Sequence, residues 1–194
     1  MFAAHVSRET PDPLPGDLAI WVFIFAELVV FGILFIAYAV ARSTHVTLFD
    51  TAQLAINRVF GFINTWLLLT SSYFVVRATQ AIRNDRRQIC AYWLTAAMSF
   101  GAMFLLLKLI EFKQDASRGI TLSSNLFDMF YLSLTFFHFM HVVMGMIILS
   151  VVTYKAYKGR YSAANHTGVE TGASYWHMVD LVWIVLFALV YVMH

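Results

Sequence analysis

The fold of this chain is decided by residues 18–41, which read LAIWVFIFAELVVFGILFIAYAVA. The run is 24 residues long and nearly all apolar, and an α-helix needs about 20 apolar residues to cross the hydrocarbon core of a bilayer. Asp17 precedes the run in the position of an N-cap. The stretch therefore predicts a membrane-spanning helix. Its length, and a leader that is not basic, argue against a cleavable signal peptide.

Four further apolar runs follow it, at residues 59–76, 89–112, 126–153 and 174–193. Each run is continuous, whereas the strands of a membrane β-barrel alternate apolar and polar residues. The chain is therefore predicted to be an all-α, polytopic membrane protein with five transmembrane helices. These helices are expected to form a single bundle over residues 17–194, after a polar N-terminal tail at residues 1–16.

The composition of the whole chain agrees with this fold and excludes several classes of protein. Of the 194 residues, 60% are hydrophobic and 12% are charged, against about 25% charged residues in soluble domains. Five spans leave no room for a soluble catalytic domain. A net charge of +2 offers no basic face for nucleic acid. The single cysteine, Cys90, excludes an intrachain disulfide and a cysteine-ligated iron–sulfur cluster.

The distribution of Lys and Arg predicts a cytoplasmic N-terminus, because cytoplasmic loops are enriched in these residues. The tail and the loops on its side of the membrane carry eight basic residues, and the opposite side carries four. One short loop and its flanks hold half of the larger set, at Arg77, Arg83, Arg86 and Arg87. These arginines are predicted either to contact anionic headgroups or to act only as a topology signal.

Ionisable side chains at membrane depth are the candidate functional residues, because a charge there costs roughly 2.5–3.5 kcal/mol on insertion scales. They are Glu27, Lys108, Glu111, Asp128, His138, His141, His177 and Asp180. Three pairs among them are spaced i,i+3, so each pair shares a helix face.

Two of these pairs predict contacts within one helix. Lys108 and Glu111 are expected to form an ion pair near the outer interface, with extension of the Lys108 ammonium toward water as the alternative. His177 and Asp180 are expected to form a hydrogen bond between imidazole and carboxylate, with a proton relay as the alternative.

The third pair, His138 and His141, raises the question of a metal site, since neutral imidazole suits copper, iron and zinc. A full site needs three or four ligands, and the flanking loops hold few. No metal site is therefore predicted, and hydrogen bonds from the imidazoles to Glu27 or to a partner protein are favoured. Three roles stay open for Glu27: an anchor within the bundle, a contact to a lipid headgroup or to buried water, and a proton carrier.

Five segments, in this order, resemble those of subunit III of the haem-copper oxidases over residues 16–191. They read WVFIFAELVVF (21–31), LLTSS (68–72), KLIEF (108–112), HFMHVVMG (138–145) and YWHMVDLVW (175–183). The last is the most specific, since the family pattern is Tyr-Trp-His-Phe-Val-Asp-Val-Val-Trp. The long form of the family has seven helices, so the chain resembles the short five-helix branch. That branch includes subunits of quinol oxidases and proteins associated with nitric oxide reductases.

The resemblance implies a non-catalytic subunit in the cytoplasmic (inner) membrane of a bacterium. The complex would be a terminal oxidase that reduces O2, or a nitric oxide reductase, with cytochrome c or quinol as electron donor. Haem and copper or iron are expected in a partner catalytic subunit, subunit I, and none is expected in this chain. The resemblance further implies that the chain stabilises subunit I, binds phospholipid and supports proton uptake. A free-standing transporter or proton-conducting protein, and a metal enzyme built on His138 and His141, are the competing hypotheses.

Overall fold

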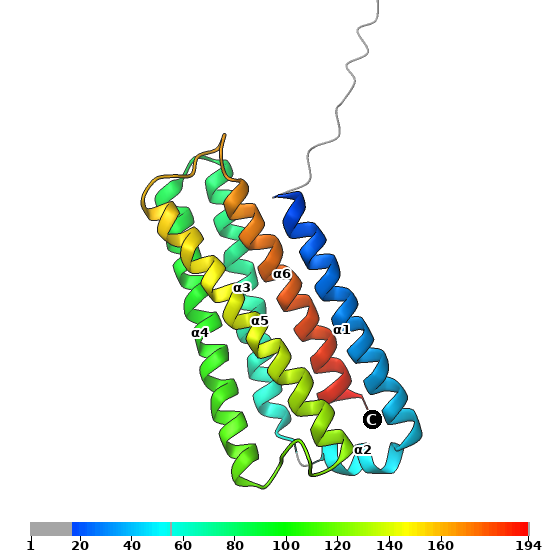
Figure 1. The fold of residues 1–194 in the computed structure, drawn as a ribbon. Helices are drawn as coiled ribbons and strands as arrows, with labels where there is room; N and C mark the ends of the chain where they lie inside the picture. Colours follow the sequence, from blue (N-terminus) through cyan, green and yellow to red (C-terminus); the bar gives the residue numbers. More distant parts are fainter. Residues whose placement is uncertain (1–16, 55, 194) are drawn as a thin grey trace, which may run out of the picture.

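The computed structural model describes residues 17–54 and 56–193. Its elements, which Figure 1 shows, are α1 (Leu18–Thr44), α2 (Val46–Gln53), α3 (Arg58–Arg83), α4 (Arg87–Ser117), α5 (Leu126–Tyr157), α6 (Thr167–Phe187) and the π-helical turn η1 (Ala188–Val192). Five of the helices are long and apolar enough to cross a membrane. The prediction of an all-α protein with five spanning helices is confirmed. The predicted tail at residues 1–16 lies outside the described residues.

Three of the long helices begin at side chains that cap them. The carboxylate of Asp17 accepts a hydrogen bond from the backbone N–H of Ala19 at 3.3 Å, as the sequence predicts. Asn57 caps α3 in the same way, and Asn125 accepts from the N–H of Asp128 at 2.8 Å at the start of α5. Each cap satisfies an N–H that the helix leaves without a partner, which fixes where the helix starts.

The spanning helices are longer than the apolar runs that predict them. α3 continues to Arg83 rather than ending at residue 76, and α6 begins at Thr167 rather than at residue 174. Once a helix has started, each added residue contributes another backbone hydrogen bond, so the helix continues through polar sequence. The short helix α2 was not predicted, because eight residues are too few for a clear periodic pattern.

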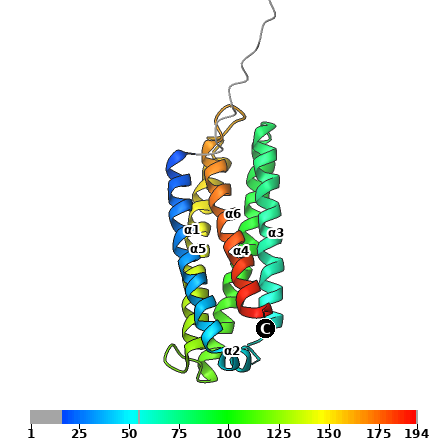
Figure 2. The same ribbon diagram turned by 90° about the vertical axis from the view of Figure 1, so that its right-hand side faces the viewer.

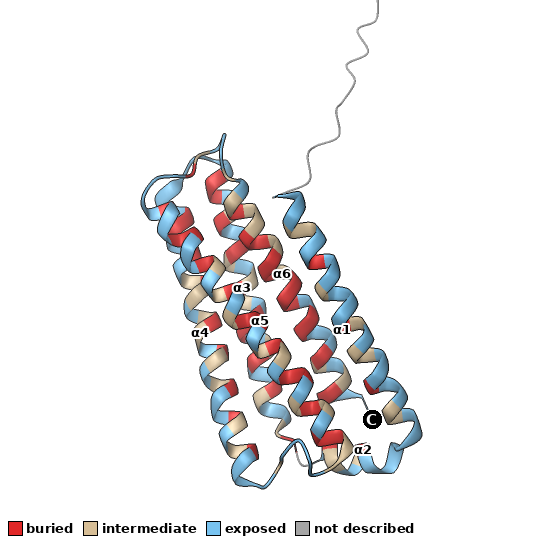
Figure 3. Ribbon diagram, viewed as in Figure 1, coloured by how far each residue is buried: buried red, intermediate tan, exposed pale blue. Residues whose placement is uncertain are grey.

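Helices α3, α4, α5 and α6 form a ring in which each packs against its two neighbours. α1 lies outside the ring, against α6 and α5, and α2 packs across one end of the bundle against α5 (Figures 1 and 2). Only three residues of α1 are buried, at intervals of seven: Ile24, Phe31 and Tyr38. α6 with its continuation η1 is the most enclosed of the spanning helices. Of its most apolar 18-residue segment, 56% is buried, against 11% of the corresponding segment of α1 (Figure 3).

Two glycines let the indole of Trp176 on α6 fit between α4 and α5. A Cβ atom added at Gly101 would lie 2.8 Å from this ring, and one added at Gly145 would lie 2.9 Å from it. Real Cβ atoms do not approach that closely, so only glycine fits at these two positions in the present packing. Gly32 on α1 is different, since nothing lies within 4 Å of an added Cβ atom.

The π-helical turn η1 and the residue that follows it, Met193, accept hydrogen bonds from side chains of α1 and α2. Tyr38 donates a hydrogen bond to the carbonyl of Leu189 at 3.2 Å, and Gln53 donates to the carbonyl of Val190 at 2.6 Å. Arg42 donates to the carbonyl of Met193, also at 2.6 Å. These donors satisfy carbonyls that the end of a helix leaves unpaired, so they join α1 and α2 to the last turn of the bundle.

Candidate functional site

Glu27 and His141 meet between α1 and α5. Nε2 of His141 lies 2.9 Å from Oε2 of Glu27, and its Nδ1 lies 2.8 Å from the carbonyl oxygen of Phe137. A carbonyl only accepts, so Nδ1 carries a hydrogen. A hydrogen bond across the 2.9 Å contact has either Nε2 or the carboxyl group as its donor. The predicted hydrogen bond from an imidazole to Glu27 is confirmed.

Apolar groups surround most of this pair. The rings of Phe31 and Phe137 lie edge-on to the His141 imidazole, with centroids at 5.1 Å and 4.7 Å. The hydroxyl of Tyr175 donates to the backbone carbonyl of His141 at 3.3 Å. The side chain of Glu27 stays 19% exposed and that of His141 9% exposed. The pair is thus largely enclosed by protein, and Glu27 is the more exposed of the two side chains.

His138 has a different environment from His141, although both share one face of α5. Its imidazole is fully buried and packs against the rings of Trp183 and Phe104, at 5.1 Å and 5.9 Å between centroids. Neither of its ring nitrogens has a hydrogen-bond partner among the described residues. The predicted hydrogen bond from this second imidazole to Glu27 is therefore not found in the part of the chain that the structure describes, and a bond to a partner protein stays a prediction. In the described part of the chain, no three His, Cys, Asp or Glu residues are placed to hold a metal ion together.

Lys108 and Glu111 form the predicted ion pair, with Nζ 2.8 Å from Oε2. The alternative, extension of the ammonium toward water, is wrong, because Lys108 is 0% exposed. Its Nζ donates a second hydrogen bond to the hydroxyl of Tyr191 at 2.8 Å. The rings of Phe112, Tyr131, Trp183 and Tyr191 surround the ammonium with their centroids 5.3–5.6 Å away. Such contacts between a cation and aromatic faces stabilise a charge that has left water.

Two tyrosines and a second carboxylate extend this ion pair. The hydroxyls of Tyr131 and Tyr191 donate to Oε1 of Glu111 at 2.9 Å and 2.8 Å. The hydroxyl of Tyr131 also lies 3.0 Å from Oδ2 of Asp115. Sequence reasoning missed Asp115 and both tyrosines. The only available signal was that Asp115 continues the i,i+3 and i,i+4 spacing of Lys108 and Glu111 along α4.

His177 and Asp180 do not form the hydrogen bond that their spacing predicts. Nδ1 of His177 instead lies 2.7 Å from the hydroxyl oxygen of Ser72 on α3. Oδ1 of Asp180 is buried without a hydrogen-bond partner among the described residues. The spacing correctly places both side chains on one side of α6, but the facing helix supplies the nearer partner for the imidazole.

The four arginines near the α3–α4 loop are largely engaged within the protein. Arg83 binds Glu170 of α6 at 2.8 Å. Arg87 contacts Asp85 and the carbonyl of Gly159, both at 3.4 Å. The guanidinium of Arg77 lies 5.6 Å from the ring centroid of Trp93, whereas Arg86 is exposed. Headgroup binding by this cluster remains a prediction, and its contacts tie the α3–α4 loop to α6 and to the α5–α6 loop.

Comparison with known proteins gives a consistent result over nearly the whole chain. A family model described as cytochrome c oxidase subunit III matches residues 16–194. Cytochrome c oxidase subunit 3 of Thermostichus vulcanus is 36% identical over 179 residues, which cover 91% of this chain and 86% of that protein. The protein of the same name from Bacillus subtilis is 29% identical over 193 residues, covering 99% and 93% of the two chains. Cytochrome bo(3) ubiquinol oxidase subunit 3 of Buchnera aphidicola is 26% identical over 176 residues, covering 89% and 83%.

Proposed function

We propose a role for this chain from one premise: it belongs to the cytochrome c oxidase subunit III family and is a subunit III of a haem-copper oxidase. Its role is that of a non-catalytic membrane subunit, which packs against a haem-bearing catalytic subunit I, stabilises it and supports its proton uptake. Haem and copper belong to that partner, and this chain binds neither. Membership of this family does not favour a free-standing transporter.

Oxygen is the proposed acceptor of the complex, and cytochrome c the proposed donor. This choice rests on the relatives, since those named after cytochrome c oxidase reach 36% identity and the one named after a ubiquinol oxidase is 26% identical. The proposed location is the bacterial cytoplasmic membrane, with the N-terminus in the cytoplasm. The excess of Lys and Arg on that side supports this orientation.

The contact between Glu27 and His141 is the observation that carries the proton-related role. Two titratable groups share one hydrogen bond of 2.9 Å at membrane depth, and one of the two side chains stays partly open to its surroundings. A proton can pass between the carboxyl group and Nε2 without movement of either side chain. Because Nδ1 is fixed on a backbone carbonyl, the imidazole keeps its orientation during such a transfer.

The test is Glu27→Gln in the intact complex. The amide has nearly the shape of the carboxyl group and still accepts a hydrogen bond, so we expect the haem-bearing subunit to co-purify in unchanged yield. Proton uptake during oxygen reduction, followed with a pH-sensitive dye, is expected to slow because the amide cannot titrate. Asp50→Asn is the matched control, since that carboxylate lies in the short helix α2 and is 44% exposed.

Three outcomes would contradict parts of this proposal. Loss of the complex in Glu27→Gln would show that the residue is an anchor of the bundle. An unchanged rate of proton uptake would remove the proton-related role and leave the packing role intact. Recovery of the native chain without any haem-bearing subunit under mild detergent would contradict the packing role itself.

A further inference from the structure

We propose that the carboxyl group of Asp115 binds a proton at the end of the bundle where α4 ends and α5 begins, and that this proton links the two helices. Asp115 and Glu111 of α4 and Tyr131 of α5 together form the proton site. Their exposed fractions are 5%, 3% and 1%, so protein encloses the site almost completely. This inference does not depend on the proton-related role of Glu27, which belongs to the separate contact with His141.

The oxygens of the proton site need one hydrogen more than Tyr131 supplies. Its hydroxyl oxygen lies 2.9 Å from Oε1 of Glu111 and 3.0 Å from Oδ2 of Asp115. A tyrosine hydroxyl carries a single hydrogen, and an ionised carboxylate only accepts. Both contacts are therefore hydrogen bonds only if one of the two carboxyl groups is protonated and donates to the hydroxyl oxygen of Tyr131.

Asp115, rather than Glu111, is the carboxyl group that carries the additional proton. Oε2 of Glu111 accepts from Nζ of Lys108, and Oε1 accepts from the hydroxyl of Tyr191, both at 2.8 Å. Glu111 thus balances the buried ammonium as a carboxylate. Asp115 takes part in no ion pair in the described part of the chain, and an enclosed carboxylate without a cation is costly. The protonated Asp115 therefore donates to Tyr131, which in turn donates to Glu111.

The other charged groups near Asp115 do not take the place of this proton. Besides its partners in the proton site, Lys108 and Arg118 of α4 lie near it, and Tyr191 of η1 lies behind Glu111. Lys108 is bound to Glu111 and Tyr191. Arg118 is exposed to solvent and forms no ion pair among the described residues. Neither cation is therefore a direct partner of the Asp115 carboxyl group.

Loss of the proton is expected to weaken the contact between α4 and α5. Two carboxylates would then share the single hydrogen of the Tyr131 hydroxyl, and one of the two oxygen contacts would have no hydrogen between its atoms. Like charges in an enclosed site repel each other strongly, because the surroundings screen them poorly. Asp115 lies two residues before the end of α4 at Ser117, and residues 117–119 are exposed. Water at this end of the bundle is therefore the expected source and acceptor of the proton.

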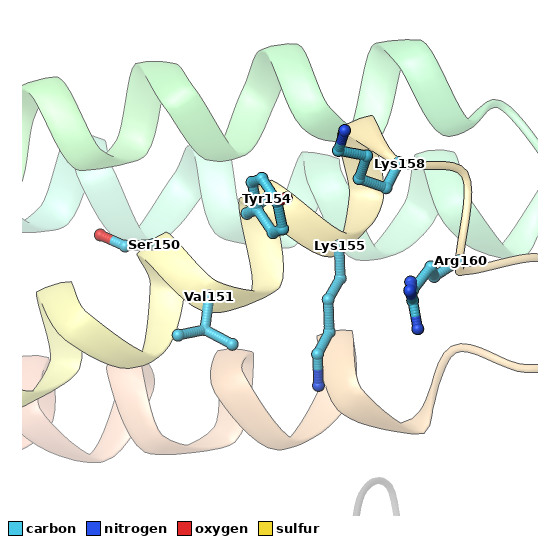
Figure 4. Close-up of a pocket in the computed structure, with 6 residues that line it drawn as sticks. All are labelled: Ser150, Val151, Tyr154, Lys155, Lys158 and Arg160. Atoms are coloured by element: carbon cyan, nitrogen blue, oxygen red, sulfur yellow. The ribbon is translucent and has the colours of Figure 1, made fainter.

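The charged residues at the opposite end of α5 form no comparable site. Lys155, Lys158 and Arg160 line an open hollow, and all three are exposed. Figure 4 shows the side chains of Lys155 and Lys158 on opposite sides of the helix. Water and salt screen such charges from one another, so a titration that depends on direct contact between groups is expected at the proton site and not at this end of α5.

The first test is infrared spectroscopy of the oxidase complex in membranes. A protonated carboxyl group has a C=O stretching band that shifts when water is replaced by D2O and disappears when the group ionises. We expect the difference between the wild-type and Asp115→Asn spectra at neutral pH to contain one such band, which is lost as the pH is raised. The amide of Asp115→Asn can donate to Tyr131 as the protonated carboxyl group does, so this variant is expected to assemble in unchanged yield.

The second test is amide hydrogen exchange in the α4–α5 loop, residues 118–125. The rate in the wild-type complex is divided by the rate in Asp115→Asn at the same pH, so that the intrinsic pH dependence of exchange cancels. We expect a ratio near one where the carboxyl band is present. The ratio should increase several-fold at the pH where the band has disappeared, because only the wild-type site then carries two carboxylates.

The matched control is Asp128→Asn, at the same end of the bundle. Asp128 is also buried, with 7% exposed, but its carboxylate accepts a hydrogen bond from the amide of Asn125 at 2.8 Å. We expect this variant to keep the carboxyl band and its pH dependence. Tyr131→Phe provides a second reading of the band, which should shift because the carboxyl group of Asp115 loses its hydrogen-bond acceptor.

Four outcomes would overturn the proposal. Absence of the band from the difference spectrum at every pH would show that Asp115 does not hold the proton. Loss of the band in Asp128→Asn would assign the proton to the other carboxyl group, and an unshifted band in Tyr131→Phe would exclude the contact with the hydroxyl. A ratio of exchange rates that stays constant with pH would show that the proton does not link α4 to α5.

Discussion

Removal of Glu111 alone from its buried ion pair with Lys108 is predicted to destabilise the bundle more than removal of both partners. Glu111→Leu leaves the ammonium at 0% exposure with the hydroxyl of Tyr191 as its one remaining hydrogen-bond acceptor. An uncompensated buried charge of this kind costs about 3–5 kcal/mol. Lys108→Met leaves a carboxylate that still accepts from Tyr131 and Tyr191. We expect it to lose about 2 kcal/mol, the contribution of one hydrogen bond to a charged group.

The double replacement removes both charges at once. What then remains is the hydroxyl of Tyr191 without its two present partners, at a cost of about 1–3 kcal/mol. The two single effects add up to about 5–7 kcal/mol, so the coupling energy between the positions is about 4 kcal/mol, which exceeds the range of about 0.5–3 kcal/mol found for most residue pairs. Of the two single variants, Glu111→Leu is expected to be the less stable.

The measurement is unfolding of the detergent-purified chain by increasing mole fractions of sodium dodecyl sulfate. The indole of Trp183 lies 5.3 Å from the Lys108 ammonium, so tryptophan fluorescence reports on this part of the bundle. The wild-type chain, the two single variants and the double variant are compared under identical conditions. A double variant that loses as much free energy of unfolding as the two single variants together would refute the reasoning.

Three further predictions follow from the packing and hydrogen bonds. Gly145→Val should cost about 1–3 kcal/mol through overpacking, measured by the same unfolding assay, whereas Gly32→Ala on the open side of α1 should be nearly neutral. Gln53→Leu should cost about 1–2 kcal/mol, because the carbonyl of Val190 loses its hydrogen-bond donor. Amide hydrogen exchange in the turn η1 should then increase, and unchanged exchange would contradict that contact. Ser72→Ala removes the hydrogen-bond partner of His177, and should cost about 1 kcal/mol without loss of the complex; a loss of the complex would argue against a purely local contact.

The five spanning helices could be predicted from the sequence because apolar length is a local property. The ends of the helices could not. α3 runs through Arg77 and Arg83 and α6 begins before its apolar run, since backbone hydrogen bonds do not depend on side-chain polarity. The helix α2 could not be predicted from the sequence for a related reason. It is held by contacts with distant parts of the chain, such as the bond from Gln53 to the end of α6, which no local pattern reveals.

Among the candidate site residues, prediction succeeded for Glu27. It is the only charged residue in the first apolar run, residues 18–41, so its partner had to come from another helix and its contact with His141 could be inferred. His177 had a carboxylate nearby in sequence, yet its imidazole contacts Ser72 of the facing helix. Which partner this imidazole contacts depends on how α3 and α6 are aligned along their axes. The alignment of α4, α5 and η1 likewise brings Tyr131 and Tyr191 to Glu111, a meeting of three helical segments that spacing within one helix cannot predict.

The placement of α1 has a consequence for synthesis. This helix is made before α5 and α6, the helices that it packs against. At about 5–20 residues per second, the interval between synthesis of Thr44, at the end of α1, and of His141, in α5, is on the order of ten seconds. During that interval the carboxyl group of Glu27 is in the bilayer without its imidazole. We therefore expect an insertase or a neighbouring subunit to shield the carboxyl group of Glu27 until the bundle has assembled.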